Sequence, residues 1–303
     1  MPIKLDYLWA GLCLVGAVYF IFGSKGARSC SCMRCIQEQD LAPFPNIGYS
    51  DGMIFGNESI SQYSKSNVFL WMIMAFQAGM LNIGGFMACH RFVSHVTGFA
   101  TFFGSEMSKG QLRNALGMLT VPLFFLFGAM LSGVLVDLPL QQNKKPRYYI
   151  TFGVIFVLIL SVAVAGAIGR LGDFGSPLET SQDYTLLILL CLTCGIQNGT
   201  VTTVSRSIVR TTHLTGITTD LGVGIIRLLN RHKIGSKIDI EKKASLMRIG
   251  IIAFFGFGSI VGGYAFSRFG YPGFFLPAMT SGGLFATMMY FQVFKKFTPE
   301  VQP

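Results

Sequence analysis

The sequence predicts an all-α integral membrane protein with two internal repeats, each of about three spanning helices plus one shorter half-helix, and an extra N-terminal transmembrane anchor. Three observations predict this class. Hydrophobic residues make up 51% of the 303 residues and charged residues 13%, against about a quarter charged in ordinary soluble domains. The apolar stretches are continuous, unlike the alternating strands of a membrane β-barrel. One polar motif also occurs twice along the chain.

Seven apolar runs are long enough to cross a bilayer, which takes about 20 helical residues. They lie near residues 5–23, 68–88, 114–136, 149–169, 185–204, 249–267 and 273–294. The first run could be a signal peptide, but no strongly basic segment precedes it and basic residues follow it at once, so we predict a retained anchor. The predicted organisation is an anchor at 1–23, a polar linker or docking arm at 24–67, repeat one at 68–170, repeat two at 185–294 and a short tail at 295–303.

The duplicated motif, here called the HxTG segment, reads SHVTGFATFFG from Ser94 and THLTGITTDLG from Thr212. Five residues recur 118 positions apart: His95, Thr97, Gly98, Thr101 and Gly104 return as His213, Thr215, Gly216, Thr219 and Gly222. The flanking sequences agree too, since GMLN from Gly79 returns as GIQN from Gly195. A duplicated unit with a polar motif inside apolar sequence is typical of membrane transporters, whose sites lie where the repeats meet.

Loop charges predict the orientation of the repeats. The loop at 137–148 and the segment 227–248 are basic, whereas 170–184 is acidic. The positive-inside rule places the basic loops on the inner side, so repeat two enters the membrane from the opposite side to repeat one and the repeats are inverted. This path requires each HxTG segment to dip into the membrane and return. If both segments cross fully, the repeats are parallel.

Each HxTG segment has the residues of an exposed helix start. We expect Thr97 or Thr215 to cap a helix whose first N–H groups lack partners, and the following glycine to permit close approach of a backbone or an ion. Such a helix start attracts anions. His95 and His213, two residues earlier, are placed either to bind a solute or relay protons, or only to bond a neighbouring carbonyl.

Other polar residues lie within apolar sequence. Asn82, Gln197 and Asn198 either hold a broken helix together or line a site. Asp220 is an intramembrane carboxylate that pairs with Arg206 and Arg210, or lies with them at the headgroup level. The candidate substrate-binding set is therefore Asn82, His95, Thr97, Gly98, Gln197, Asn198, His213, Thr215, Gly216 and Asp220.

The sequence predicts no enzyme, no metal site and no cofactor. It contains no P-loop, dinucleotide-binding turn, HExxH motif or nucleophile elbow in a plausible context. Cys30, Cys32 and Cys35 lack a fourth zinc ligand at a recognised spacing and are free thiols, lipidated or disulfide-bonded. The net charge of +10 is spread over short loops between apolar runs, so we predict no nucleic-acid partner.

The segment GIQNGTVTTVSRSIVRTTHLTGITTDLG from Gly195, with FQAGMLNIGGF from Phe76 and FVSHVTGFATFFG from Phe92, resembles the YoaK-like family of uncharacterised multispan membrane proteins over about residues 70–294. This chain has Asn82 where the family commonly has an acidic residue, and Phe99 where it commonly has asparagine. The resemblance implies a multispan helical architecture and lends no activity.

Two functions are left open. The first is a transporter or channel for a small, anionic solute, with its site between the two HxTG half-helices. The alternative is a non-catalytic accessory or structural subunit of a larger membrane complex, such as an organellar respiratory or photosynthetic assembly, docked through residues 1–67. Expected partners are membrane lipids, those docked proteins or a second copy of the chain. The membrane is a bacterial inner membrane or an organelle membrane.

Overall fold

The computed structural model describes residues 65–142, 144–176, 181–205, 213–230, 232 and 238–294, all within the second of two compact units, Ile47–Pro303. The predicted anchor, most of the docking arm, the tail and Cys30, Cys32 and Cys35 lie outside these residues. In the described ranges the regular elements are all helical, with no strand. The predicted all-α class is confirmed for this part of the chain.

Six helical rods in the described ranges are long and apolar enough to cross a membrane. They run over Val68–Cys89, Leu112–Gln141, Tyr148–Ala167, Tyr184–Val204, Ile238–Phe269 and Tyr271–Phe294. Six of the seven predicted spans are thereby confirmed, and the run at 5–23 lies outside the described residues. The chain is a multispan membrane protein.

Four of these rods are single helices, and a fifth is a helix with a short turn at each end. They are α2 (Lys65–Cys89), α7 (Tyr148–Ala167), α8 (Ser181–Val204), α10 (Ile238–Phe269) and α11 (Phe275–Met289), which the 3-10 turn η5 (Tyr271–Phe274) precedes and the π turn η6 (Tyr290–Phe294) extends. The second rod has four pieces: α4 (Leu112–Met118), α5 (Thr120–Ser132), the π turn η2 (Gly133–Asp137) and α6 (Leu138–Gln141).

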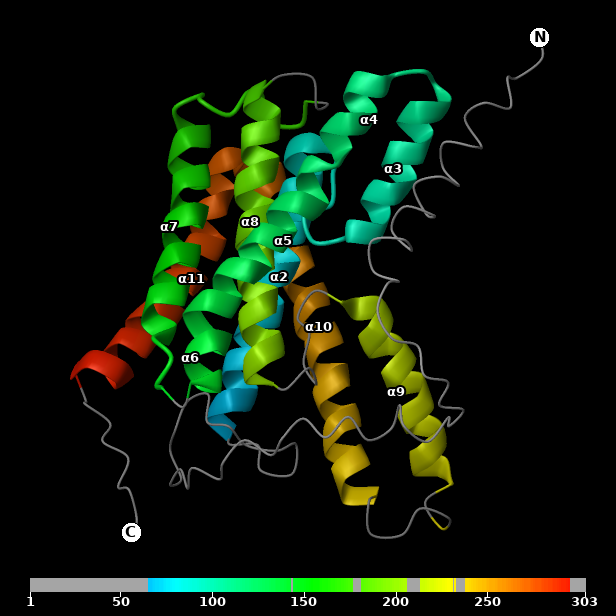
Figure 1. Cartoon of the computed structure of the whole chain (residues 1–303), viewed down its shortest axis with the longest axis vertical. Helices are drawn as coiled ribbons and strands as arrows, with labels where there is room; N and C mark the ends of the chain where they lie inside the picture. The colour runs from blue at the N-terminus through cyan, green and yellow to red at the C-terminus, as the bar shows by residue number, and fades with distance from the viewer. Residues whose placement is uncertain are drawn as a thin grey trace, which may run out of the picture. The chain divides into compact units, whose positions relative to one another are not determined.

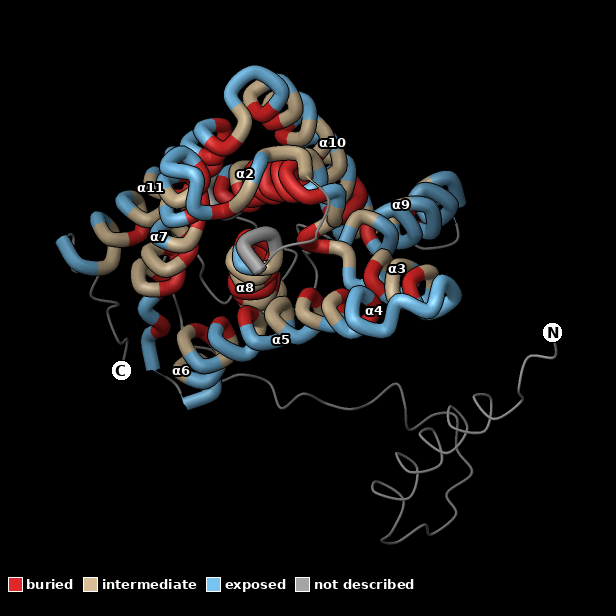
Figure 2. The backbone as a smooth tube through the Cα atoms, turned by 90° about the horizontal axis from the view of Figure 1, so that it is seen from above, coloured by how far each residue is buried: buried red, intermediate tan, exposed pale blue. Residues whose placement is uncertain are grey.

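Two further helices are too short to cross. They are α3 (Val96–Ser108), with 13 residues, and α9 (Leu214–Leu229), with 16 residues. In Figure 1, α2 rises, the chain turns back, and α3 begins near mid-height and rises to the upper end. In the second half α8 descends, and α9 begins near mid-height and descends to the lower end. Both HxTG segments therefore form half-helices that start near mid-height, at the edge of the bundle (Figures 1 and 2).

Helices α2 and α8 form the centre of the bundle. Within their apolar windows 72% of α2 and 67% of α8 are buried, against 22 to 39% of the other four spans. Figure 2 shows these two helices surrounded by the others when the bundle is seen along its length. The outer helices expose apolar side chains, as expected for surfaces that face lipid.

The closest helix contacts join the first and second halves of the chain. A Cβ at Gly79 of α2 would overlap the carbonyl oxygen of Phe255 on α10. A Cβ at Gly195 of α8 would likewise overlap the carbonyl oxygen of Phe125 on α5. Glycine permits these backbone-to-backbone contacts, which pack helices tightly where lipid supplies no hydrophobic driving force.

The turns at the upper end depend on positive backbone angles. Gly169, Gly172 and Gly175 have φ between +74° and +89° between α7 and α8, and Gly270 ends α10 with φ +61°. His90 has φ +55°, and its Nε2 lies 2.9 Å from the carbonyl oxygen of Gly175. The end of α2 is therefore tied to the loop between α7 and α8.

Candidate solute-binding site

The two histidines of the repeated motif occupy equivalent positions in the structure. His95 is the N-cap residue of α3 and His213 that of α9, with ψ angles of 89° and 59°. Neither histidine side chain forms a capping hydrogen bond with its helix. The first-turn N–H groups of both half-helices therefore receive no hydrogen bond from their N-cap side chains, and the positive end of each helix dipole lies near mid-height (Figure 1).

The predicted threonine caps are wrong. Thr97 and Thr215 lie inside the first turn of their helices, because each helix begins directly after the histidine. Their carbonyl oxygens instead accept hydrogen bonds from the hydroxyls of Thr101, at 3.5 Å, and Thr219, at 3.0 Å. These matched bonds lie one turn along each half-helix.

Among the described residues, no backbone comes close to the motif glycines, so the predicted close approach is not found there. A Cβ at Gly216 would meet no atom within 4 Å, and one at Gly98 would meet only side-chain atoms, at 3.8 Å or more. His95 is half-buried against the ring of Phe92, at 5.3 Å between ring centroids. Thr97 is exposed. The starts of both half-helices therefore leave part of their surface exposed outside the packed helices.

Helix α9 exposes most of its polar residues. His213, Thr215, Gly216 and Asp220 are all exposed, and α9 packs mainly against α10. Among the described residues no ion pair involves Asp220. Arg206 and Arg210 lie outside those residues, so the predicted pairing of Asp220 with them stays a prediction.

Two of the three candidate amides hold the bundle together. The Ser94 hydroxyl donates to Asn82 Oδ1 at 2.9 Å, which ties the segment before α3 to α2. Gln197 on α8 accepts from Gln77 on α2 at 3.0 Å and donates to the carbonyl oxygen of Met74 at 2.8 Å. These buried amide groups already have partners, so their geometry is that of structural residues.

Asn198 differs from its repeat-one equivalent, Asn82. Its side chain is buried, and its Oδ1 has no hydrogen-bond partner in the part of the chain that the structure describes. The residue equivalent to Ser94 in the second repeat is Thr212, which lies outside the described residues. Of the three candidate amides, Asn198 is thus the one with an unused acceptor.

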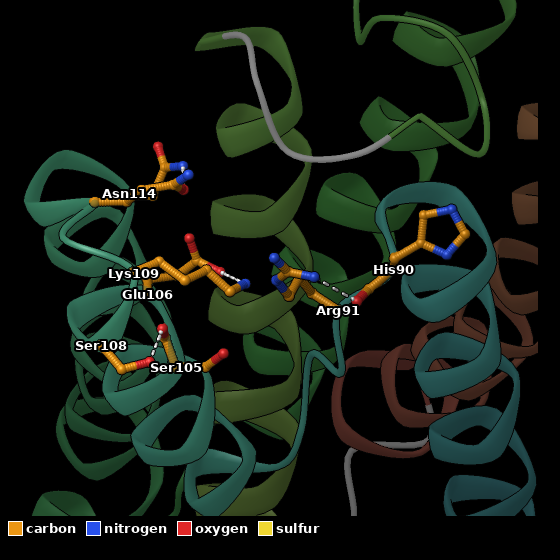
Figure 3. A network of polar contacts seen from close by, with 8 residues as sticks. His90, Arg91, Ser105, Glu106, Ser108, Lys109 and Asn114 are labelled. Carbon is orange, nitrogen blue, oxygen red and sulfur yellow. Dashed lines mark hydrogen bonds and ion pairs between the residues drawn. The ribbon is translucent and has the colours of Figure 1, made fainter.

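Ion pairs lie at the outer ends of both half-helices. At the end of α3, Lys109 Nζ lies 3.0 Å from Glu106 Oε1, and Figure 3 shows Arg91 pointing toward this pair. The Lys109 hydrogen bond holds the pKa of Glu106 below its usual value. At the end of α9, Glu241 of α10 accepts from Arg227 at 3.1 Å and from Arg248 at 2.8 Å.

The repeat itself contains the signal that identifies these ion pairs. Lys109 and Arg227 are 118 residues apart, the same spacing as His95 and His213. The carboxylate lies on the half-helix in repeat one, as Glu106, and on the neighbouring span in repeat two, as Glu241. A position-by-position comparison of the two halves misses the matching ion pairs, because the carboxylate lies on α3 in the first half and on α10 in the second.

The described residues contain no group of three or more His, Cys, Asp or Glu side chains that could hold a metal ion. Cys191 and Cys194, which have redox-like spacing, are buried and free in α8.

The fold and these positions define a multispan helical membrane protein with two half-helices. A family model described as "Protein of unknown function (DUF1275)" matches residues 70–288, and the chain belongs to this family. The resemblance drawn from the repeated motifs is confirmed. No curated protein and no solved structure matches the chain.

Proposed function

We propose that the protein is a transporter or channel for a small anionic solute, formed by two inverted repeats. One observation carries the proposal: α3 and α9 begin near mid-height without side-chain caps and run to opposite ends of the bundle (Figure 1). Two helix starts that face the midplane place partial positive charge where an anion is hardest to accommodate in a bilayer.

The packing of the spanning helices supports inverted repeats. Gly79 against Phe255 and Gly195 against Phe125 are the same contact made twice, once from each half of the chain. The corresponding helices run in opposite directions, since α2 rises and α8 descends (Figure 1). A two-fold axis in the membrane plane relates elements in this way.

The exposed polar face of α9 supports a route for water or solute beside this helix. Thr215, Thr218, Thr219 and Asp220 are exposed, although polar groups facing lipid are costly. Water along α9 would satisfy them. In this proposal His95 and His213 donate to the anion at the midplane. Thr215 and Asn198 line its path. Asp220 lies further along α9, toward the side of the membrane that the positive-inside rule assigns as the inner side.

The test is anion flux into proteoliposomes that contain the full chain, with chloride, nitrate, formate and phosphate as probes. We expect flux of at least one probe in the parent protein, and a loss of about tenfold or more in His213→Ala, because each well-placed ion contact is worth about 1.5 to 3 kcal/mol. His232→Ala, an exposed histidine beyond α9, is the matched control and keeps full flux. No flux of any probe, or equal flux in both variants, contradicts the proposal.

The exposed face of α9 also fits a second function, that of an accessory subunit. A partner protein packed on Thr218 and Asp220 would satisfy the same groups without water. Extraction in a mild detergent distinguishes the two functions. A monomer or small homo-oligomer favours the transporter, and stoichiometric migration in a large complex favours the subunit.

A further inference from the structure

An apolar groove lies between α7 and α11, away from the half-helices. It has a volume of about 420 Å³ and is lined by Tyr149, Ile150, Gly153, Val154, Val157, Leu158, Phe285 and Met289. Its walls carry almost no polar surface. From Tyr149 to Leu158 the groove follows α7 for about 14 Å at 1.5 Å per residue, which is close to one leaflet of a hydrocarbon core about 30 Å thick.

Two glycine and phenylalanine pairs pack α7 against α11, and one of them, Gly153 with Phe285, lines the groove. A Cβ at Gly153 would lie 3.1 Å from the ring of Phe285, and one at Gly282 would lie 3.1 Å from the ring of Phe156. The two rings stack with 6.3 Å between centroids and 9° between planes. Each glycine leaves room for the opposite ring, so the groove belongs to the packing of the two helices.

The lower end of the groove is basic. Helix α7 begins directly after Lys144, Lys145 and Arg147, which are all exposed. Gln292 of η6 holds this loop in place, since its Nε2 donates to the carbonyl oxygen of Pro146 and its Oε1 accepts from the N–H of Tyr149, both at 3.1 Å. The backbone of the basic loop is therefore held next to Tyr149, which lines the groove.

We propose that this groove binds one acyl chain of an anionic phospholipid from the leaflet at the lower end in Figure 1, with the headgroup against Lys144, Lys145 and Arg147. The apolar walls match a hydrocarbon chain, and the basic loop matches a negative headgroup at the same end. The site is separate from the solute-binding residues, so it stands whether or not the protein transports anions.

Native mass spectrometry of the delipidated full chain in detergent tests the headgroup. The protein is titrated with dioleoylphosphatidylglycerol and, separately, with dioleoylphosphatidylcholine, which has the same chains and a zwitterionic headgroup. We expect the anionic lipid to bind more than about tenfold tighter, since each basic residue near an anionic headgroup contributes a factor of about five. Replacing Lys144, Lys145 and Arg147 by glutamine lowers the affinity for the anionic lipid to that for the zwitterionic one. Equal affinities in the parent protein overturn the proposal.

Filling the groove with a larger side chain tests whether the acyl chain binds there. Val157→Trp places an indole in the groove, and we expect about tenfold weaker binding of both lipids. Val164→Trp is the control, because Val164 lies two turns further along α7, is similarly exposed and does not line the groove. Equal lipid binding by the two variants overturns the site. The glutamine variant changes only an exposed loop, so its result stands even if a tryptophan variant unfolds.

Discussion

Buried amides show what single residues of this chain do. Gln197 was predicted as a candidate site residue, yet it bonds Gln77, which in turn accepts from the hydroxyl of Thr280 at 3.0 Å. The sequence identifies Gln197 as an unusual polar residue in an apolar run but does not indicate its partner, because the partner lies 120 residues away. The threonine caps were wrong for a local reason. A shift of one or two residues in where a helix begins decides which side chain occupies the N-cap position.

Removal of one amide should destabilise the bundle. Gln77→Leu leaves Gln197 Oε1 without its donor, whereas the Thr280 hydroxyl keeps the carbonyl oxygen of Pro277 as an acceptor. An unsatisfied buried group costs about 1 to 3 kcal/mol. We expect a lower melting temperature in detergent, measured by circular dichroism. Gln111→Leu is the control, because this exposed amide bonds only exposed Asn114.

The double variant Gln77→Leu, Gln197→Leu should recover part of that loss, because replacing both partners by apolar groups is nearly neutral. Repeat one already has leucine, Leu81, at the position equivalent to Gln197. A double variant less stable than Gln77→Leu alone would show that the amides do more than satisfy one another.

At the scale of helices, hydrophobic length predicted the six described spans to within a few residues at most ends. The clear exception is α10, which begins at Ile238 although its apolar run begins at 249. The segment from Asp239 to Arg248, which contains acidic and basic residues, continues the same helix beyond the apolar stretch. Its Glu241 pairs with Arg227 of α9, and Arg248 supports Glu241 from within α10. Hydropathy cannot detect a helix that extends into water.

Contacts between helices can be tested at two glycines of α10. Gly258→Leu would push a side chain into the carbonyl oxygen of Phe76 and force α2 and α10 apart, whereas a side chain at Gly256 meets no atom within 4 Å. We expect Gly258→Leu to lose about 3 kcal/mol or more, beyond the usual cost of overpacking because the clash is with backbone. Gly256→Leu should melt close to the parent protein. Equal melting temperatures would show that α2 and α10 do not pack this closely.

For the whole molecule, the sequence predicted inverted repeats from loop charge, and the directions of the helices agree with that path (Figure 1). Charge alone left a parallel arrangement open, because it does not show whether an HxTG segment crosses. Helices α3 and α9, with 13 and 16 residues, are too short for a span of about 20, and these lengths support the inverted arrangement that we propose.

Labelling from one side of the membrane distinguishes inverted from parallel repeats. Ser108 and Asn230 are exposed at the far ends of α3 and α9. In a background without the native cysteines, Ser108→Cys and Asn230→Cys should react with an impermeant maleimide from opposite sides of sealed vesicles. Reaction of both from the same side would require parallel repeats and would contradict the proposed two-fold relation.

The interlocked contacts of the two halves also set an order of biogenesis. Gly195 reaches its partner Phe125 after 70 intervening positions of synthesis, whereas Gly79 waits 176 positions for Phe255. At about 5 to 20 residues per second, α2 spends roughly 10 to 35 s in the membrane before α10 exists. For the first 120 residues of that interval, the buried amide of Gln77 lacks its partner Gln197. We expect the pair of α5 and α8 to assemble first, and the arrival of α10 then completes the packing around α2.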